Sequence, residues 1–464
     1  LPAGRGGDHP GLRTHQEPAH PECVADVNSA QSTQLPLSRI AALWLPLAAS
    51  WLLMGAELTL VSAAITRLPH PTRELAAFGS IIYPLAVAIE SPIIMILAAS
   101  TTLARTRSNY LVLRSFTNWL AVALMSLHAL IAFTPLYDVI VGQLISAPQP
   151  IVASARSGFQ LALPWVWLVG FRRLQQGVLI RFGDARAVGV GTLIRLLSEV
   201  VVLLWGAHFQ WVHGALLGAA AILAGVTAEC FYAAYRARAI HRSRLRESEG
   251  ETVTLHEFLR FYIPLAITPF LVLLCQPLIS AGLSRMPFPI VSLAVWPVVS
   301  GLLFLFRCLG LAYNEVVITL LDEPGGRDSL RRFTRLLASG VTVLFALLIV
   351  TPAGYFWFHY VAGLPPSLAR IGAATLWLAL PLPGLNVVDR WFEGQLLYQR
   401  RTTAVTESVT LFLLLLTVTL IVGMIDGSKP GIFVAVSGFV IGFISRTFWL
   451  RLRWQRLVDE GLQH

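Results

Sequence analysis

Long apolar runs recur along the whole chain and restrict it to one kind of fold. An α-helix rises 1.5 Å per residue, so about twenty apolar residues span the roughly 30 Å hydrocarbon core of a bilayer. Because unpaired backbone groups are costly in lipid, such runs must form helices. We predict transmembrane helices at 40–66, 76–103, 114–134, 155–181, 187–208, 213–239, 257–284, 290–320, 333–360, 370–398, 404–424 and 430–452.

Composition agrees with an all-α polytopic membrane protein. The 464 residues are 55% hydrophobic and only 13% charged, whereas soluble domains carry about 25% charged residues. The net charge of +10 is spread over short loops and forms no basic domain. We therefore expect the lipid bilayer, and no nucleic acid, as a partner, with anionic head groups facing the basic loops.

Basic residues mark one side of the membrane. Loops after odd-numbered helices carry few of them, which by the positive-inside rule predicts that both termini are cytoplasmic. All basic side chains but Lys429 are arginine, and this composition suggests a bacterial cytoplasmic (inner) membrane. The loops after even-numbered helices carry Arg105, Arg107, Arg186, Arg242, Arg244, Arg246, Arg327, Arg331, Arg332, Arg400 and Arg401.

Two polar stretches divide the chain. Residues 1–38 are rich in Pro, Gly and His without an apolar core, so we predict a disordered cytoplasmic tail and no signal peptide. The chain begins without Met, and the alternative that this tail is not native stays open. Residues 240–256 form the long charged loop in the middle. We predict a six-helix bundle over 39–239, a cytoplasmic linker over 240–256 and a second bundle over 257–464.

The two predicted bundles are copies of one unit. Segment 44–71 aligns without gaps on 262–289 at a shift of 218, matching Arg67 with Arg285 and several prolines. Segment 171–180 aligns on 388–397 at a shift of 217, matching Arg173 with Arg390. Because six crossings return the chain to the same side, we predict a parallel repeat related by a pseudo-twofold axis along the membrane normal.

Several segments carry a resemblance to a known family. They are "PLAASWLLMGAELTLVSAAI" and "YIPLAITPFLVLLCQPLI" at the starts of the halves, and "RRLQQGVLIRFG" and "DRWFEGQLL" near the ends of the fourth and tenth helices. With two six-helix halves, they resemble the multidrug and toxic compound extrusion (MATE) family of the MOP exporter superfamily. The segments around Gly55-Ala56-Glu57 and "FYIPLAIT" are also similar to the progressive ankylosis protein. The resemblance implies a V of two bundles around a central cavity that opens alternately to each side.

A charge inside the membrane costs several kcal/mol, so each one needs a reason. Glu57 lies about seventeen residues into the first helix, roughly 25 Å along it. It resembles the acidic residue with which MATE proteins couple transport to protons or sodium. The alternative is a carboxyl group satisfied by a hydroxyl such as that of Ser80. Glu90 and Arg307 lie at mid-depth, Arg307 about one turn beyond the counterpart of Glu90. We predict a substrate or gate role for both, either as a pair across the cavity or with separate partners.

The fourth and tenth helices end in matching polar turns. Arg172, Arg173 and Gln176 occupy the first, and Asp389, Arg390 and Glu393 the second. We predict that these turns line the cytoplasmic throat of the cavity, with Arg390 turned away from its two acidic neighbours. Arginine forks match carboxylate and phosphate, so an anionic substrate suits this wall. A salt-bridged gate and interfacial anchoring of the arginines are the alternatives.

Arg195 and Glu199 are spaced i,i+4, so we predict a structural pair, with Glu229 as another partner for Arg195. We find neither a metal-binding pattern nor a Walker or HExxH motif. We therefore expect no enzyme and no cofactor, and predict a monomeric secondary exporter of a small organic solute, driven by protons or sodium. A flippase for a lipid-linked saccharide is the alternative, and a membrane-embedded enzyme is the competitor from another class.

Overall fold

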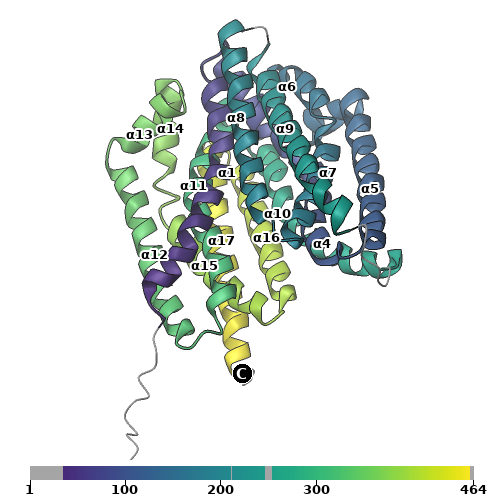
Figure 1. Ribbon diagram of the computed structural model, residues 1–464. Helices are drawn as coiled ribbons and strands as arrows, with labels where there is room; N and C mark the ends of the chain where they lie inside the picture. The colour runs from purple at the N-terminus through teal and green to yellow at the C-terminus, as the bar shows by residue number, and fades with distance from the viewer. Residues whose placement is uncertain (1–34, 211, 246–252, 460–464) are drawn as a thin grey trace, which may run out of the picture.

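The computed structural model describes residues 35–210, 212–245 and 253–459, all of whose regular elements are helical (Figure 1). The first half comprises α1 (Leu37–Ile65), α2 (Pro71–Ala77), η1 (Phe78–Ile82), α3 (Tyr83–Ile94), α4 (Ile96–Leu103), α5 (Arg107–Phe133), η2 (Asp138–Leu144), α6 (Gln149–Leu161), α7 (Trp165–Arg181), α8 (Ala185–Phe209) and α9 (Gly214–Ser243). The second half comprises α10 (Leu255–Ser284), α11 (Pro289–Leu320), α12 (Gly326–Val350), α13 (Ala353–Phe356), η3 (Trp357–Val361), α14 (Pro366–Thr375), α15 (Leu382–Tyr398), α16 (Thr402–Asp426) and α17 (Gly431–Asp459). The elements η1, η2 and η3 are single π-helical stretches.

Within the described residues, ten helices are long and apolar enough to cross a membrane, which makes the chain a multi-span membrane protein. The ten correspond to all the predicted helices except the fourth and the tenth. Each of these two is broken, into α6 and α7 and into α14 and α15. Pro164 and Pro381 stand at the breaks. Proline lacks an N–H and its ring clashes with the preceding turn, so a helix cannot run on unbroken through these positions.

Other helices differ from the prediction at their ends. The third predicted helix starts at Arg107 instead of 114, because the Thr106 side chain accepts a hydrogen bond from the Asn109 backbone and caps a polar first turn. The predicted helix 333–360 ends at Val350. At the middle of the chain, α9 continues to Ser243 and α10 begins at Leu255, inside the segment assigned to the linker. Most of the predicted N-terminal tail lies outside the described residues.

The order of the elements repeats with a nearly constant spacing. The helices α6, α7, α8 and α9 begin 217 residues before α14, α15, α16 and α17. Left-handed backbone conformations, which end helices and shape the turns between them, recur at the same spacing or one residue more. The equivalent pairs are His70 and Phe288, Ser146 and Gly363, Gly183 and Arg400, and Gln210 and Gly427.

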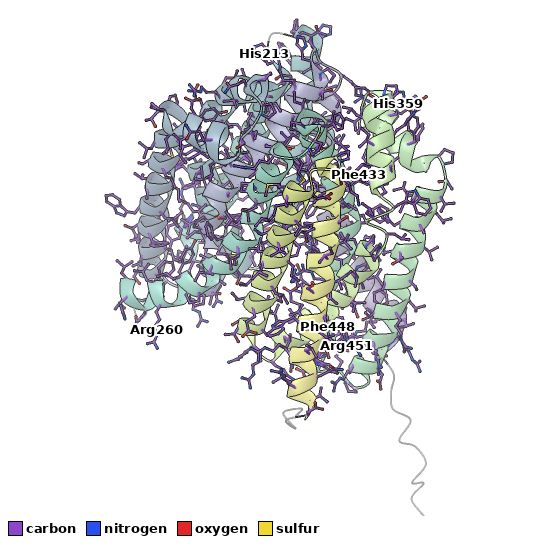
Figure 2. All side chains as sticks on the ribbon, turned by 180° about the vertical axis from the view of Figure 1, so that it is seen from behind. His213, Arg260, His359, Phe433, Phe448 and Arg451 are labelled. Atoms are coloured by element: carbon purple, nitrogen blue, oxygen red, sulfur yellow. The ribbon has the colours of Figure 1, made fainter. Side chains whose placement is uncertain are left out.

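Both described ends of the chain lie at one end of the bundle, which we call the terminal end; the opposite end is the far end (Figure 1). The helix α1 starts against the second half, where the Trp44 indole N–H donates to the Leu309 carbonyl at 2.9 Å. The helix α10 starts against the first half, where the Tyr262 hydroxyl donates to the Pro92 carbonyl at 2.5 Å. Figure 2 shows Arg260 of α10 beneath the first half, well apart from Arg451 of the second. Each half thus lends its first helix to the other.

Candidate functional site

In the first half, a buried ionic cluster is centred on Glu229 of α9. The Glu229 carboxylate forms an ion pair with Arg172 of α7 and accepts a hydrogen bond from the Gln176 side chain at 2.8 Å. A guanidinium nitrogen of Arg195, on α8, lies 3.7 Å from the same carboxylate. Arg172, Gln176 and Glu229 are all at most 4% exposed. The predicted interfacial anchoring of Arg172 is therefore wrong, because its side chain points into its own half.

Arg195 extends this cluster to α1. Its guanidinium forms an ion pair with Glu57 and donates to Glu199 at 3.2 Å. The predicted contact between Arg195 and Glu199 is present, and it is one part of a larger network. Ser80 is not the partner of Glu57, since its hydroxyl donates to the Leu293 carbonyl. Arg195 thus bridges carboxylates from α1, α8 and α9.

In the second half, Arg446 of α17 takes the central place. It donates to Glu393 at 2.6 Å and lies 3.4 Å from Asp389. Arg390 donates to the same Glu393 carboxylate at 2.5 Å. The expectation that Arg390 turns away from its acidic neighbours is wrong, because its long side chain folds back by one turn of α15 to reach Glu393.

The two clusters occupy equivalent positions with opposite charge. Arg172, Gln176 and Glu229 lie 217 residues before Asp389, Glu393 and Arg446. Cation and anion have exchanged places between α7 and α9 on one side and α15 and α17 on the other. The repeat therefore conserves the position of a buried ion pair but not its polarity.

Glu90 and Arg307 form no ion pair with each other in the described part of the chain. The span containing α2, α3 and α4 starts 218 residues before α11 and ends 217 before it, so Arg307 is aligned with Ile89 or Glu90 and not one turn beyond. Arg172 and Arg173 are the cations close enough to act on Glu90. The Arg307 guanidinium lies over the rings of Phe443 and Phe439, at 4.6 and 5.3 Å from their centroids.

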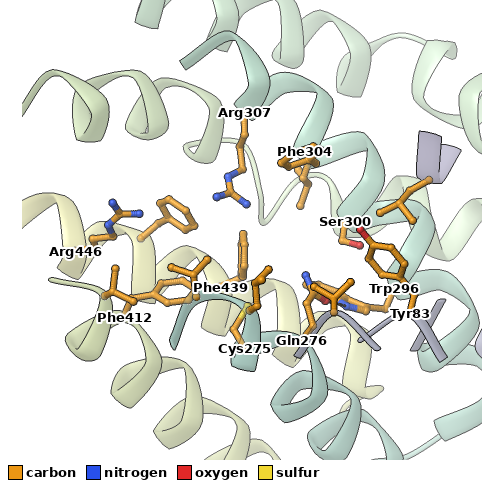
Figure 3. A pocket seen from close by; sticks show the side chains of 17 residues that line it. Tyr83, Cys275, Gln276, Trp296, Ser300, Phe304, Arg307, Phe412, Phe439 and Arg446 are labelled. Carbon is orange, nitrogen blue, oxygen red and sulfur yellow. Dashed lines mark hydrogen bonds between the residues drawn. The ribbon is translucent and has the colours of Figure 1, made fainter. Parts of the chain in front are cut away.

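A cavity of about 250 Å³ lies between the halves (Figure 3). Leu58, Tyr83 and Val87 line it from the first half, and residues of α10, α11, α16 and α17 line the rest. Both Arg307 and Arg446 belong to its wall. Figure 3 shows the Arg307 guanidinium pointing into the hollow above Phe439, with Arg446 to one side.

A larger hollow of about 1040 Å³ lies toward the terminal end, between α10 and α16. Its wall includes Pro264, Pro269, Thr268 and Glu393. The Thr268 and Thr406 hydroxyls meet across it at 3.0 Å. Because Glu393 lines this hollow and Arg446 lines the smaller cavity, their hydrogen bond stands between the two spaces.

At the far end, two equivalent arginines join the halves. Arg67 at the end of α1 donates to the carbonyls of Tyr360 and Val361 in η3, at 3.0 and 3.4 Å. Arg285 at the end of α10 donates to the carbonyls of η2 and the following residue, including Leu144 at 2.6 Å. Each arginine thus binds the carbonyl end of a π-helical stretch in the opposite half. We call the two together the arginine clasps.

The structure brings most of the predicted site residues into two separate clusters. Glu57 joins Arg172, Gln176, Arg195 and Glu199 through Glu229 in the first half. In the second half Asp389, Arg390 and Glu393 meet at Arg446, which was not predicted from the sequence. Its signal was present, because Arg446 is the 217-residue counterpart of Glu229. Arg172 lines neither of the two hollows described.

No family model matches this chain, and no curated protein matches it either. Its fold is that of the MATE-like transporters of the MOP superfamily. An inward-facing multidrug resistance MATE transporter superposes with a TM-score of 0.65 at 14% identity, covering 90% of this chain and 99% of the other.

The lipid II flippase MurJ, in an inward closed conformation, matches with a TM-score of 0.65 at 14% identity over 88% of this chain and 87% of the other. A MOP superfamily transporter from Pyrococcus furiosus, described as having a binding pocket of reverse polarity, matches with a TM-score of 0.56 at 13% identity over 91% and 96%. These similar structures are transporters and a flippase, not enzymes. The likeness to the progressive ankylosis protein is not shown by these matches and stays a prediction.

Proposed function

We propose that this protein is a secondary active exporter of the MATE/MOP type. It moves a small organic solute, a drug or an anionic metabolite, out across a bacterial cytoplasmic membrane, with both termini in the cytoplasm. Two six-helix bundles related by a parallel pseudo-twofold axis rock against each other, driven by a proton or sodium gradient. The protein acts as a monomer.

One observation carries this proposal: an internal cavity between the halves, separated from a larger terminal-end hollow by the bond between Glu393 and Arg446. A transporter needs a central site whose access on each side can open and close. Glu393 has a second partner in Arg390, at 2.5 Å. The carboxylate therefore stays paired when Arg446 moves away, which lowers the cost of opening this inner gate.

The opposite gate lies at the far end, where the arginine clasps join the halves. Both clasps bind backbone carbonyls rather than carboxylates. Their release exposes a guanidinium and helix-end carbonyls to water at the membrane surface, where hydration replaces the lost bonds. Opening this end by a rigid movement of the halves is therefore feasible energetically.

Coupling is assigned to Glu57. Its carboxylate links α1, which packs against the second half, to Arg195 of the first half. When Glu57 takes up a proton, Arg195 keeps Glu199 and Glu229 as partners. Protonation then releases α1 without leaving a buried cation unpaired, so an ion binding step controls the position of one helix.

The test uses purified protein in proteoliposomes, with a panel of solutes under imposed pH and sodium gradients. Glu57→Gln is expected to remove the dependence of transport on the gradient while the protein stays folded. Glu323→Gln is the matched control, since Glu323 pairs with Arg39 on the surface. Gradient-driven transport that survives unchanged in Glu57→Gln contradicts the coupling assignment, and absence of any solute movement contradicts the exporter.

The alternative is a flippase for a lipid-linked saccharide. It is favoured by the 1040 Å³ hollow between α10 and α16, whose volume is at the upper end of the roughly 300–1,000 Å³ usual for small-molecule pockets. Such a space suits a head group that enters sideways from the lipid. Transfer of a fluorescent polyprenyl-linked saccharide between leaflets, without movement of water-soluble solutes, decides for this alternative.

A further inference from the structure

We propose that the cavity between the halves binds a small aromatic organic anion, with Arg307 as the residue that holds the anionic group. This inference rests on the proposed transport function and names its substrate class. The cavity, and not the basic turn at Arg172 and Arg173, is then the anion site. Arg172 is already neutralised by Glu229 within the first half.

Arg307 is a cation without an acidic partner in the described chain. No ion pair or hydrogen bond joins it to another described residue, and its buried Nε has no partner. The nearest acid, Asp389, lies beside Arg446 and Arg390. The contacts of Arg307 are the rings of Phe439 and Phe443. A guanidinium inside a membrane protein needs a counter-charge, and a bound anion supplies one.

The charge of the cavity wall selects against cations. Arg307 and Arg446 are its charged residues, and none of the described residues lining it is acidic. In an environment of low dielectric constant the two guanidinium groups repel a cation and attract an anion much more strongly than in water. The Arg307 fork offers two parallel N–H donors to a carboxylate.

The rest of the wall fits a flat apolar body. Trp296, Phe304, Phe412, Phe439 and Phe443 line the cavity together with Tyr83. Aromatic rings pack edge-to-face or offset against another ring, which adds to the gain from apolar burial. The volume of about 250 Å³ lies below the usual range for drug-sized ligands, so the ligand has one or two rings.

The test compares three probes of one shape and different charge: 2-naphthoate, 2-naphthamide and 2-naphthylmethylammonium. Binding to the full chain in lipid nanodiscs is measured by calorimetry, with empty nanodiscs as the blank. We expect 2-naphthoate to bind about ten- to a hundredfold more tightly than the amide, the size of one charged hydrogen-bonded contact. We expect the ammonium probe not to bind.

Arg307→Gln is expected to reduce the affinity for 2-naphthoate to that for the amide. Arg260→Gln, which removes the same charge from an exposed position on α10, should leave all three affinities unchanged. Ser300→Asp adds an acid to the same cavity wall and provides a second variant if Arg307→Gln does not fold. It should abolish 2-naphthoate binding and admit the ammonium probe.

Equal binding of anion and amide, or unchanged anion selectivity in Arg307→Gln, overturns this inference. Because the binding measurement needs no gradient, it is separate from the transport assay. Anion-selective binding without gradient-driven transport overturns the exporter and leaves the site. Transport of cations with no anion binding overturns the site and leaves the exporter.

Discussion

The ionic clusters of the two halves differ in polarity although they occupy the same positions. In the first half a central glutamate, Glu229, is surrounded by Arg172, Arg195 and Gln176. In the second half a central arginine, Arg446, faces Asp389 and Glu393. The paired helices α7 and α9, and α15 and α17, need a buried polar link at this depth, and either arrangement of charges provides it.

The neighbourhoods of the clusters explain why the exchange matters. Around Glu229, further carboxylates and Arg195 connect the cluster to α1 and so to the other half. Around Arg446, the additional charge is Arg307, which faces the cavity. The first half therefore has the groups suited to binding a coupling cation, and the second half those suited to holding an anion. Inverted polarity separates the two tasks between the halves.

The largest expected effect comes from removing the central acid of the first half. Glu229→Gln leaves Arg172 buried without its carboxylate, which is expected to cost about 3 kcal/mol or more of stability. Asp389→Asn should cost about 1 kcal/mol or less, because Arg446 keeps its bond to Glu393. Reversible unfolding in mixed micelles measures both. Equal losses would show that the two clusters are energetically alike.

Exchanging the polarities sharpens the comparison. The triple change Asp389→Arg, Glu393→Gln and Arg446→Glu copies the first-half arrangement into the second half and should fold, losing less than about 2 kcal/mol. The reverse triple change in the first half places an arginine at position 229, next to Arg195, and should lose more. If the first half tolerated its exchange better, the bridging role of Arg195 would be wrong.

The arginine clasps provide a comparison in which the halves should behave alike. Arg67→Gln and Arg285→Gln each remove a charged donor from backbone carbonyls and should favour opening of the far end by about tenfold. A cysteine replacing the buried Ala362 reports opening through its rate of reaction with a maleimide. Arg156→Gln is the control, since Arg156 pairs with Asp138 within its own half. A large effect of only one clasp would contradict their equivalence.

The smallest effects are expected at exposed ion pairs. Loss of Arg39, which bridges to Glu323 of the other half, or of Arg236, which pairs with Asp184 in its own half, should each cost less than about 1 kcal/mol. Labelling of a cysteine at the terminal end should increase with Arg39→Gln alone. An equal increase with Arg236→Gln would mean that the measurement reports general loosening.

Much of the fold could be predicted because helix length and apolar content depend on local sequence alone. Ten of the predicted helices are single long helices, and the repeat spacing of 217 to 218 recurs in the element boundaries. The two broken helices were missed because hydropathy does not register the effect of Pro164 and Pro381 on the backbone. The contacts of Glu57 with Arg195, and of Arg390 with Glu393, required knowledge of how each helix is rotated.

The sequence by itself determined a multi-span helical membrane protein, its internal repeat and the identity of its intramembrane charges. The reason is that lipid forces the backbone into helices and penalises every ion, which leaves a record in composition and spacing. Only the tertiary structure decided which charges meet, which one is left facing a cavity, and where the halves clasp each other. Those outcomes depend on the rotation and crossing of helices, and side chains hundreds of residues apart set them jointly.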